Sequence, residues 1–315
     1  MVLDPTMEDV SIMVSVCMIT YGHEQYIEEA ILSILDQETT FNYEFIISND
    51  ASPDATDFKI QHILSYHPKA NKIQYIKQEH NIGMTANFIY VLGQAKGTYV
   101  AYCEGDDYWT DSLKLQKQVD FLEAHPEYSL SFTRFQAIQL NSSSLIIDNY
   151  GRYFKNNQSY IEFDFDKFTA GWPGGTLTLM YRNDMFDVSN AKKYIYFRDI
   201  HLYTELLKSA NGVCLNFFSA VYREHQGGIY SSATLLERAK IASMCYKEIY
   251  ALNKEIPELR LKYIYFKKNY INQLLINKFY IKSFIETLKF GFYFKNIQII
   301  INGNKKIIKY ILFSK

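Results

Sequence analysis

The chain has 315 residues, of which 48% are hydrophobic and 21% are charged, so it can bury a large α/β core and disorder is excluded as its dominant state. With a net charge of -1, we expect no nucleic acid among its partners. The charge is unevenly distributed along the chain. From Lys254 onward there are 13 Lys and Arg but only 3 Asp and Glu, whereas the preceding 253 residues contain 20 Lys and Arg and 31 Asp and Glu.

The cysteines indicate a reducing compartment. They are far apart in the chain, and the first three lie in apolar, strand-like contexts, which favours buried thiols over a disulfide or zinc framework: Cys17, Cys103, Cys214 and Cys245. The N-terminal residues lack a signal-peptide pattern, and no segment has the roughly 18 apolar residues that cross a bilayer. We therefore expect a cytoplasmic protein that contacts a membrane at most from its inner face.

A unit of strand, turn and helix repeats along the first 95 residues. The predicted strands cover 14–19, 43–48 and 72–76, and the helices that follow cover 24–37, about 55–66 and 84–94. Such alternation is typical of right-handed crossovers and a mostly parallel sheet, whose loops converge on one edge.

The fourth strand, predicted at 98–103, stops in the acidic loop Glu104–Asp107, where three carboxylates surround Gly105. At the carboxyl end of a parallel strand this loop lies where open α/β sheets bind ligands. Oxygen ligands without nearby Cys or His suit a hard divalent ion such as Mg²⁺ or Mn²⁺. The alternative is an acidic β-turn, because Asp and Gly are ordinary turn residues.

The usual glycine-rich phosphate cradles are absent from the sequence. No Gly-x-Gly-x-x-Gly follows the first strand, and no Gly-x-x-x-x-Gly-Lys-Ser/Thr occurs anywhere. If the sheet edge binds a nucleotide, a metal ion held by carboxylates is the available means of neutralising the phosphate charge.

Beyond residue 126 the pattern is looser. We expect strands near 129–140, 145–148, 176–181, 213–217 and 219–222, a helix at 199–210, and helices from 232 to the end with a break at 302–304. Two glycine-bearing loops interrupt this part, at 171–175 and 223–228.

The order of motifs resembles that of the family 2 glycosyltransferases of the bacterial type, which have the GT-A fold. The motifs are Thr20-Tyr21-Gly22-His23, Asn49-Asp50-Ala51-Ser52-Pro53-Asp54, Asn81-Ile82-Gly83, Glu104-Gly105-Asp106-Asp107, Arg198-Asp199 and Tyr222-Arg223-Glu224-His225. The resemblance implies a catalytic domain at 10–228, with a nucleotide-sugar half at about 10–125 and an acceptor half at about 126–228, before a helical, basic extension at 229–315. It implies inverting sugar transfer from a nucleoside diphosphate sugar, with UDP expected, to an acceptor hydroxyl in surface polysaccharide or glycolipid assembly.

The resemblance also assigns residues to the donor. Thr20 and Tyr21 would line the nucleotide pocket, Asp50 would accept a hydrogen bond from the base, and Arg223 would meet the phosphates. Glu104 stands where the family more often has Asp, and its longer side chain could reach the ribose or a metal-bound water. The alternative for Asp50 is a turn or helix cap.

Metal and catalytic roles follow from the same resemblance. Asp106, Asp107 and His225 would hold Mn²⁺ or Mg²⁺, and Asp199 would be the general base that deprotonates the acceptor. The family usually has Glu-Asp where this chain has Arg198-Asp199, so Asp199 could instead cap its helix. His225 could equally be an ordinary surface histidine.

Both tryptophans are candidates for the acceptor side. Trp109 and Trp172 lie in loops near the expected site, and aromatic faces pack well on sugars, although core packing is an equal alternative for Trp109. The basic, aromatic tail after Lys262 could lie on an anionic membrane, where a lipid-linked saccharide acceptor would be found, or pack on its own domain or a partner.

Two other functions remain open at this point. A sugar-1-phosphate nucleotidyltransferase would need a glycine-rich, basic loop after the first strand, which Thr20-Tyr21-Gly22-His23 does not supply. A catalytically inactive sugar-nucleotide-binding protein at the membrane would retain the donor residues without needing Asp199.

Overall fold

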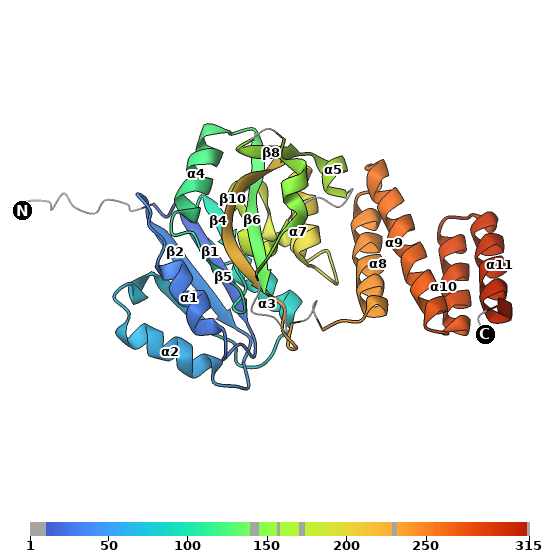
Figure 1. Cartoon of the computed structure of the whole chain (residues 1–315), viewed down its shortest axis with the longest axis horizontal. Helices are drawn as coiled ribbons and strands as arrows, with labels where there is room; N and C mark the ends of the chain where they lie inside the picture. Colours follow the sequence, from blue (N-terminus) through green and yellow to red (C-terminus); the bar gives the residue numbers. More distant parts are fainter. Residues whose placement is uncertain (1–10, 139–144, 156–157, 170–173, 229–231, 314–315) are drawn as a thin grey trace, which may run out of the picture. The chain divides into compact units, whose positions relative to one another are not determined.

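The computed structural model describes residues 11–138, 145–155, 158–169, 174–228 and 232–313. The chain divides into two compact units, one ending at Gly227 and the other beginning at Gly228 (Figure 1). We describe each unit by itself.

The first unit begins with alternating strands and helices. Their bounds are β1 Val14–Thr20, α1 Ile27–Leu35, β2 Tyr43–Asn49, α2 Thr56–Tyr66, η1 Ala70–Lys72, β3 Ile73–Lys77, α3 Met84–Leu92, β4 Tyr99–Tyr102, β5 Tyr108–Trp109 and α4 Lys114–Ala124. The unit continues with β6 Tyr128–Ile138, β7 Leu145–Ile147, η2 Asn149–Tyr153, β8 Tyr160–Phe163, α5 Phe165–Thr169, η3 Thr176–Thr178, β9 Met180–Arg182, η4 Asn183–Met185, α6 Val188–Ala191, α7 Asp199–Leu207 and β10 Asn211–Arg223.

One sheet runs through the unit in the order β3-β2-β1-β4-β9-β6-β10-β5, with β7 on β6 and β8 on β10. The four strands of the first half are parallel, and Val14 of β1 pairs with Tyr43 on one side and Tyr99 on the other. Because parallel strands point the same way, their carboxyl ends meet at one edge. This confirms the predicted α/β fold with parallel strands at its centre, although β9, β5, β7 and β8 pair antiparallel in the second half.

Helix α1 shows why these segments fold as they do. Its fully buried residues recur three and four positions apart and pack in the core with β1, β2 and β4: Ile27, Ala30, Ile31, Ile34 and Leu35. Each large apolar side chain buried in this way contributes about 1.5–3 kcal/mol. The four cysteines are all buried thiols outside any disulfide, as predicted.

Three predicted strands differ from the structure. Residues 176–181 alternate like a strand, yet the N–H and the hydroxyl of Thr178 both donate to the carbonyl of Gly175, which closes the turn η3 and leaves only Met180–Arg182 as β9. The two strands predicted at 213–222 are one strand, β10. The expected break is a shift in its pairing with β6 between Leu215 and Phe218.

The second unit is helical, as the sequence predicts for the C-terminal extension. It contains α8 Leu235–Leu252, α9 Pro257–Ile276, α10 Tyr280–Tyr293 and α11 Ile297–Phe313, and each packs on the next along the chain. The predicted break at 302–304 is wrong. Helix α11 runs through Gly303 because the missing side chain lets α10 approach: a Cβ there would lie 2.2 Å from Thr287 Cγ2.

The outer surface of α10 and α11 mixes large apolar side chains with lysines. The exposed apolar residues are Phe279, Ile281, Phe284, Ile285, Phe292, Tyr293, Ile301 and Ile308. The exposed lysines are Lys278, Lys282, Lys289, Lys295, Lys305, Lys306 and Lys309. Within the described part of the chain, no helix combines the length and the hydropathy needed to cross a bilayer.

Candidate active site

The acidic loop Glu104–Asp107 leaves the carboxyl end of β4 beside the end of β1. The N–H of Gly105 donates to the carbonyl of Ile19 at 3.1 Å, which keeps the loop against β1. A Cβ on Gly105 would lie only 2.7 Å from Thr20 Oγ1. Glycine is therefore required where the loop meets the turn that follows β1.

Two histidines from distant parts of the chain meet Asp106. His225 Nε2 lies 2.9 Å from Asp106 Oδ2, and His23 Nε2 lies 3.7 Å from the same oxygen. One ligand atom from each residue lies within 4.8 Å of the other two, and we call these residues the two-histidine cluster. Imidazole nitrogen and carboxylate oxygen are ligands of divalent transition metals, so this donor set fits a metal ion such as Mn²⁺.

The protonation of the cluster also suits a cation. Burial alone would raise the pKa of Asp106, but the hydrogen bond from His225 and the charge of His23 outweigh it and hold that pKa below its usual value. Burial lowers the pKa of His23, although the charge of Asp106 opposes the shift. An ionised carboxylate beside a neutral imidazole is the state in which both residues can bind a metal.

Asp107 lies outside the two-histidine cluster. It is 2% exposed, and its Oδ1 accepts the N–H of Arg223 at 2.8 Å. Burial, together with the charges of Asp106 and Glu104, raises the pKa of Asp107 well above its usual value. The structure thus gives Asp107 a role in joining the acidic loop to β10, and metal binding by Asp107 stays a prediction.

Arg223 fastens the acidic loop to α1. Its Nη1 donates to the carbonyl of Asp106 at 2.8 Å, and its Nη2 pairs with Glu29. The guanidinium also lies over the ring of Tyr108 at 4.2 Å and near that of Tyr26 at 5.4 Å. These contacts use much of its hydrogen-bonding capacity, so the predicted phosphate contact would have to share it.

Glu104 and Asp199 lie within electrostatic range of each other. Burial raises the pKa of Glu104 well above its usual value, and the charges of Asp106 and Asp199 raise it further. Its Oε2 is buried without a hydrogen-bond partner among the described residues. A polar group in this state is ready to bind a ligand, because an unpaired buried oxygen costs free energy.

Asp199 is the first residue of α7. Its Oδ1 accepts the N–H of Ile200 at 2.8 Å, and its Oδ2 lies 3.5 Å from the hydroxyl of Thr176. Burial raises its pKa, which makes it a stronger base than an ordinary Asp. The helix N-cap is Arg198, but Asp199 itself accepts a free N–H of the first turn, so it has a contact at the helix start and its role as the general base stays a prediction.

The residues assigned to the nucleotide lie at the ends of β1 and β2. Thr20 is buried, whereas Tyr21 is 48% exposed. Asp50 is buried and accepts the N–H groups of Ile82 and Gly83 at 2.7 and 3.0 Å. It therefore ties the Asn81-Ile82-Gly83 motif to β2, and each of its oxygens keeps further acceptor capacity for a base.

Trp109 occupies a core position. It is 4% exposed, its Nε1 donates to the carbonyl of Leu177 at 2.8 Å, and Lys114 Nζ lies 4.1 Å from the ring centre. This favours the core alternative for Trp109 and leaves little of its ring for a sugar. Trp172 lies outside the described residues.

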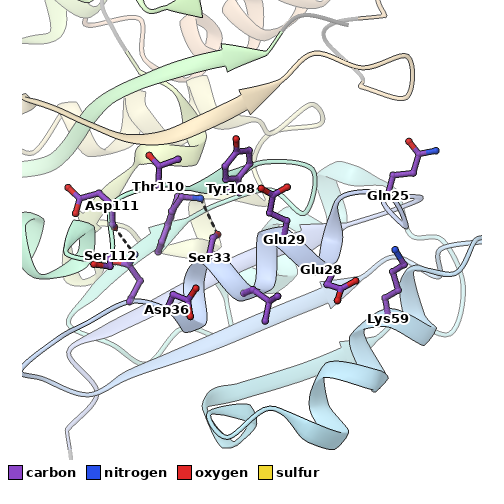
Figure 2. A pocket seen from close by; sticks show the side chains of 13 residues that line it. Gln25, Glu28, Glu29, Ser33, Asp36, Lys59, Tyr108, Thr110, Asp111 and Ser112 are labelled. Carbon is purple, nitrogen blue, oxygen red and sulfur yellow. Dashed lines mark hydrogen bonds between the residues drawn. The ribbon is translucent and has the colours of Figure 1, made fainter. Parts of the chain in front are cut away.

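An open pocket of about 640 Å³ runs along α1 beside the site. Figure 2 shows Tyr108 and Asp111 on one side of it and Glu29 and Asp36 of α1 on the other. It does not include the two-histidine cluster, but Glu29 connects it to Arg223.

His23 and Glu29 contact the site residues Asp106 and Arg223, although neither was predicted from the sequence. His23 ends the turn directly after β1, and that position at the carboxyl end of a central strand was the available signal. Glu29 had no such signal, because an acidic residue in the first turn of a helix is ordinary.

Comparisons with known proteins show which family and fold this chain is similar to. Residues 15–182 match the model of the family described as Glycosyl transferase family 2. An uncharacterized protein of Mycobacterium tuberculosis is 47% identical over 118 residues, which are 38% of this chain and 34% of that relative. This match therefore spans about a third of the relative's length. The UDP-Glc:alpha-D-GlcNAc-diphosphoundecaprenol beta-1,3-glucosyltransferase of Escherichia coli is 24% identical over 222 residues, 70% of this chain and 80% of that one.

A solved structure has the same fold. It is the mannosyltransferase of Pyrobaculum calidifontis in complex with GDP-Man and Mn²⁺, which is 13% identical and matches with a TM-score of 0.55 over 97% of this chain and 88% of that one. With the family match, this likeness confirms the GT-A fold predicted from the sequence.

Proposed function

This chain belongs to glycosyl transferase family 2, and on that premise we propose that it transfers a sugar from a nucleoside diphosphate sugar to an acceptor hydroxyl with inversion at the anomeric carbon. The observation that carries the proposal is the two-histidine cluster at the acidic loop, where Asp106 Oδ2 lies 2.9 Å from His225 Nε2 and 3.7 Å from His23 Nε2. This donor set supports a divalent ion at the edge of the sheet where the diphosphate of the donor is expected.

In the proposed reaction, Asp199 is the general base. The acceptor oxygen attacks the anomeric carbon and its proton passes to an oxygen of Asp199, while the bond from that carbon to the diphosphate oxygen breaks and its electron pair leaves with the nucleoside diphosphate. The raised pKa of Asp199 supports this role, since a more basic carboxylate accepts the proton more readily. Inversion requires Asp199 and the diphosphate to lie on opposite faces of the sugar.

Asp106 and His225 are proposed to hold Mn²⁺ or Mg²⁺. When bound, such an ion neutralises the negative charge that develops on the diphosphate. The Mn²⁺ in the mannosyltransferase of the same fold supports the use of a divalent metal. Asp107 could join them through Oδ2 or through the remaining lone pair of Oδ1, which also accepts the N–H of Arg223.

The donor is proposed to be a UDP-sugar bound by Thr20, Tyr21, Asp50, Glu104 and Arg223. Uracil offers the N–H that the carboxylate of Asp50 can accept, and guanine does so too. The E. coli relative is named for UDP-Glc, whereas the mannosyltransferase holds GDP-Man. UDP is preferred because the E. coli enzyme is the more similar in sequence.

The acceptor is proposed to be a saccharide or lipid-linked saccharide in surface polysaccharide or glycolipid assembly. The E. coli relative is named for a diphosphoundecaprenol-linked acceptor. The exposed phenylalanines and lysines of α10 and α11 suit the interface of an anionic membrane, which would be the inner face of the cytoplasmic membrane. Trp172 keeps its proposed contact with the acceptor sugar.

The test incubates the full chain with Mn²⁺, a panel of UDP-, GDP- and dTDP-sugars and polyprenyl-diphosphate saccharides, and measures release of nucleoside diphosphate. We expect turnover with a UDP-sugar, donor binding without turnover in Asp199→Asn, and loss of both in Asp106→Ala. Pyrophosphate formation from a sugar phosphate and a nucleoside triphosphate would identify a nucleotidyltransferase instead. A wild-type protein that binds the donor but transfers nothing across the panel would be an inactive binding protein.

A further inference from the structure

We propose that His23 is a metal ligand, and that with Asp106 and His225 it makes the site select Mn²⁺ and similar transition-metal ions over Mg²⁺. The inference rests on the proposed function only in that the same ion would serve the nucleotide sugar. It adds a ligand from the turn after β1 to the residues that the acidic loop and the late loop supply.

The spacing of the three side chains fits one ion. Bonds of about 2.1 Å from a metal put neighbouring ligand atoms about 3.0 Å apart in octahedral geometry and about 3.4 Å apart in tetrahedral geometry. Asp106 Oδ2 lies 2.9 Å from His225 Nε2 and 3.7 Å from His23 Nε2. The two imidazole nitrogens lie within 4.8 Å of each other, so side-chain movements of about an ångström would bring all three atoms around one ion.

The ring of His23 is held in the orientation that a ligand needs. Its Nδ1 lies 3.2 Å from Thr20 Oγ1, and Thr20 is 2% exposed. If Nδ1 donates its hydrogen to that hydroxyl, Nε2 carries the lone pair and points at Asp106. Metal-binding histidines commonly make this kind of second hydrogen bond, which sets the tautomer and the ring plane.

Gly105 makes room for the His23 ring beside Thr20. A Cβ on Gly105 would lie 2.7 Å from Thr20 Oγ1 and 3.1 Å from His23 Nδ1. The His23 ring meets that of His225 edge-on, with centres 6.0 Å apart. Two imidazoles and one carboxylate thus face a single point from three segments of the chain.

This ligand set predicts the metal. Mg²⁺ binds oxygen ligands and retains its waters, so two imidazole nitrogens serve it poorly. Mn²⁺ and the later transition-metal ions accept imidazole, and sites with two histidines and one carboxylate are typical of such metals. A site built from the acidic loop alone would show no such preference.

The experiment measures metal binding directly on the full chain. Mn²⁺ is titrated by electron paramagnetic resonance, Mg²⁺ affinity is found by competition, and pulsed measurements count the histidine nitrogens coupled to Mn²⁺. We expect two coupled imidazoles in the wild type and one in His23→Gln, with Mn²⁺ affinity reduced at least about tenfold. The control His62→Gln changes an exposed histidine on α2 and should leave both readouts unchanged.

A second variant tests selectivity without removing the ligand. His23→Glu has the reach to place an oxygen where Nε2 lies, so Mn²⁺ should still bind while the ratio of Mn²⁺ to Mg²⁺ affinity falls. The inference is overturned if the wild type couples one imidazole, or if His23→Gln retains wild-type Mn²⁺ affinity. Far-ultraviolet circular dichroism of each variant establishes that it is folded.

The same samples separate this inference from the proposed function. Sugar transfer by a protein whose Mn²⁺ affinity does not depend on His23 would overturn the inference and leave the function standing. Binding of Mn²⁺ through two histidines without any sugar transfer would support the inference and contradict the function.

Discussion

Replacing Asp199 by Asn tests the assignment of the general base with little disturbance of the fold. Asn keeps an oxygen for the N–H of Ile200, which Asp199 Oδ1 accepts at 2.8 Å. Its amide can donate to the hydroxyl of Thr176, which lies 3.5 Å from Oδ2. The substitution therefore removes the proton acceptor and keeps the local hydrogen bonds.

The expected loss follows from general-base catalysis, which contributes about 10²–10⁴-fold to a rate. At about 1.36 kcal/mol per tenfold, Asp199→Asn should raise the barrier by about 2.7–5.4 kcal/mol. Donor affinity should remain within about twofold, because the acidic loop is untouched. The assay is kcat from nucleoside diphosphate release, with donor binding measured by calorimetry.

The pH dependence supplies a second readout. Burial raises the pKa of Asp199, so wild-type kcat should increase as the pH rises through that value, and the Asn variant should lack this limb. Stability should change in the opposite sense. A raised pKa means that the carboxyl supports folding below its unfolded pKa and loses that contribution as the pH rises through the folded pKa. At neutral pH, Asp199→Asn should therefore unfold at a temperature no lower than the wild type does.

The matched control is Asp187→Asn, an exposed Asp that accepts the N–H of Ser189 at the start of α6. It should retain wild-type kcat and pH dependence. If Asp199→Asn kept kcat within a few-fold of the wild type, or lost activity only by losing donor affinity, Asp199 would not be the base.

Three further predictions concern the rest of the site and the helical unit. Arg223→Lys loses the hydrogen bond to the Asp106 carbonyl and the contact of the guanidinium with the Tyr108 ring, so the free energy of unfolding in urea should fall by about 1–3 kcal/mol. An unchanged urea midpoint would contradict a stabilising role for these contacts. Burial lowers the pKa of Lys114 from 10.5 to about 7, so wild-type stability should increase from about pH 7 to 10, and Lys114→Met should abolish that increase. Gly303→Val should cost about 1–3 kcal/mol by its clash with Thr287, although Val has the higher helix propensity, whereas Asn302→Val, exposed on the same helix turn, should cost less. Equal changes in stability would contradict the close approach of Gly303 to Thr287.

Much of the site could be predicted because it depends on local sequence. The strands β1, β2 and β4 are apolar runs that end in polar turns, and parallel strands bring those turns to one edge. The acidic loop was found in this way, whereas Asp199 was assigned from the resemblance to family 2 glycosyltransferases. The argument from the ends of the strands would also have identified His23, which lies in the turn after β1, as a site residue.

Other features have no local signal. Trp109 stands in a polar loop sequence, yet the carbonyl of Leu177 and the side chain of Lys114 enclose it. Asn302-Gly303-Asn304 has the composition of a break, yet contact with α10 keeps it helical. In both cases contacts far along the chain overrule local preference.

Sequence by itself determined the alternation of strands and helices in the first 95 residues, the parallel edge and the kinds of side chain at that edge, because hydrophobic periodicity and turn residues act over short distances. Only the tertiary structure decided which of these side chains contact one another. His23 and His225 reach Asp106, and Arg223 reaches Glu29, from opposite ends of the first unit, because β10 returns to the sheet and its end lies beside the turn after β1. A distance between side chains so far apart in the chain depends on the packing of every element between them.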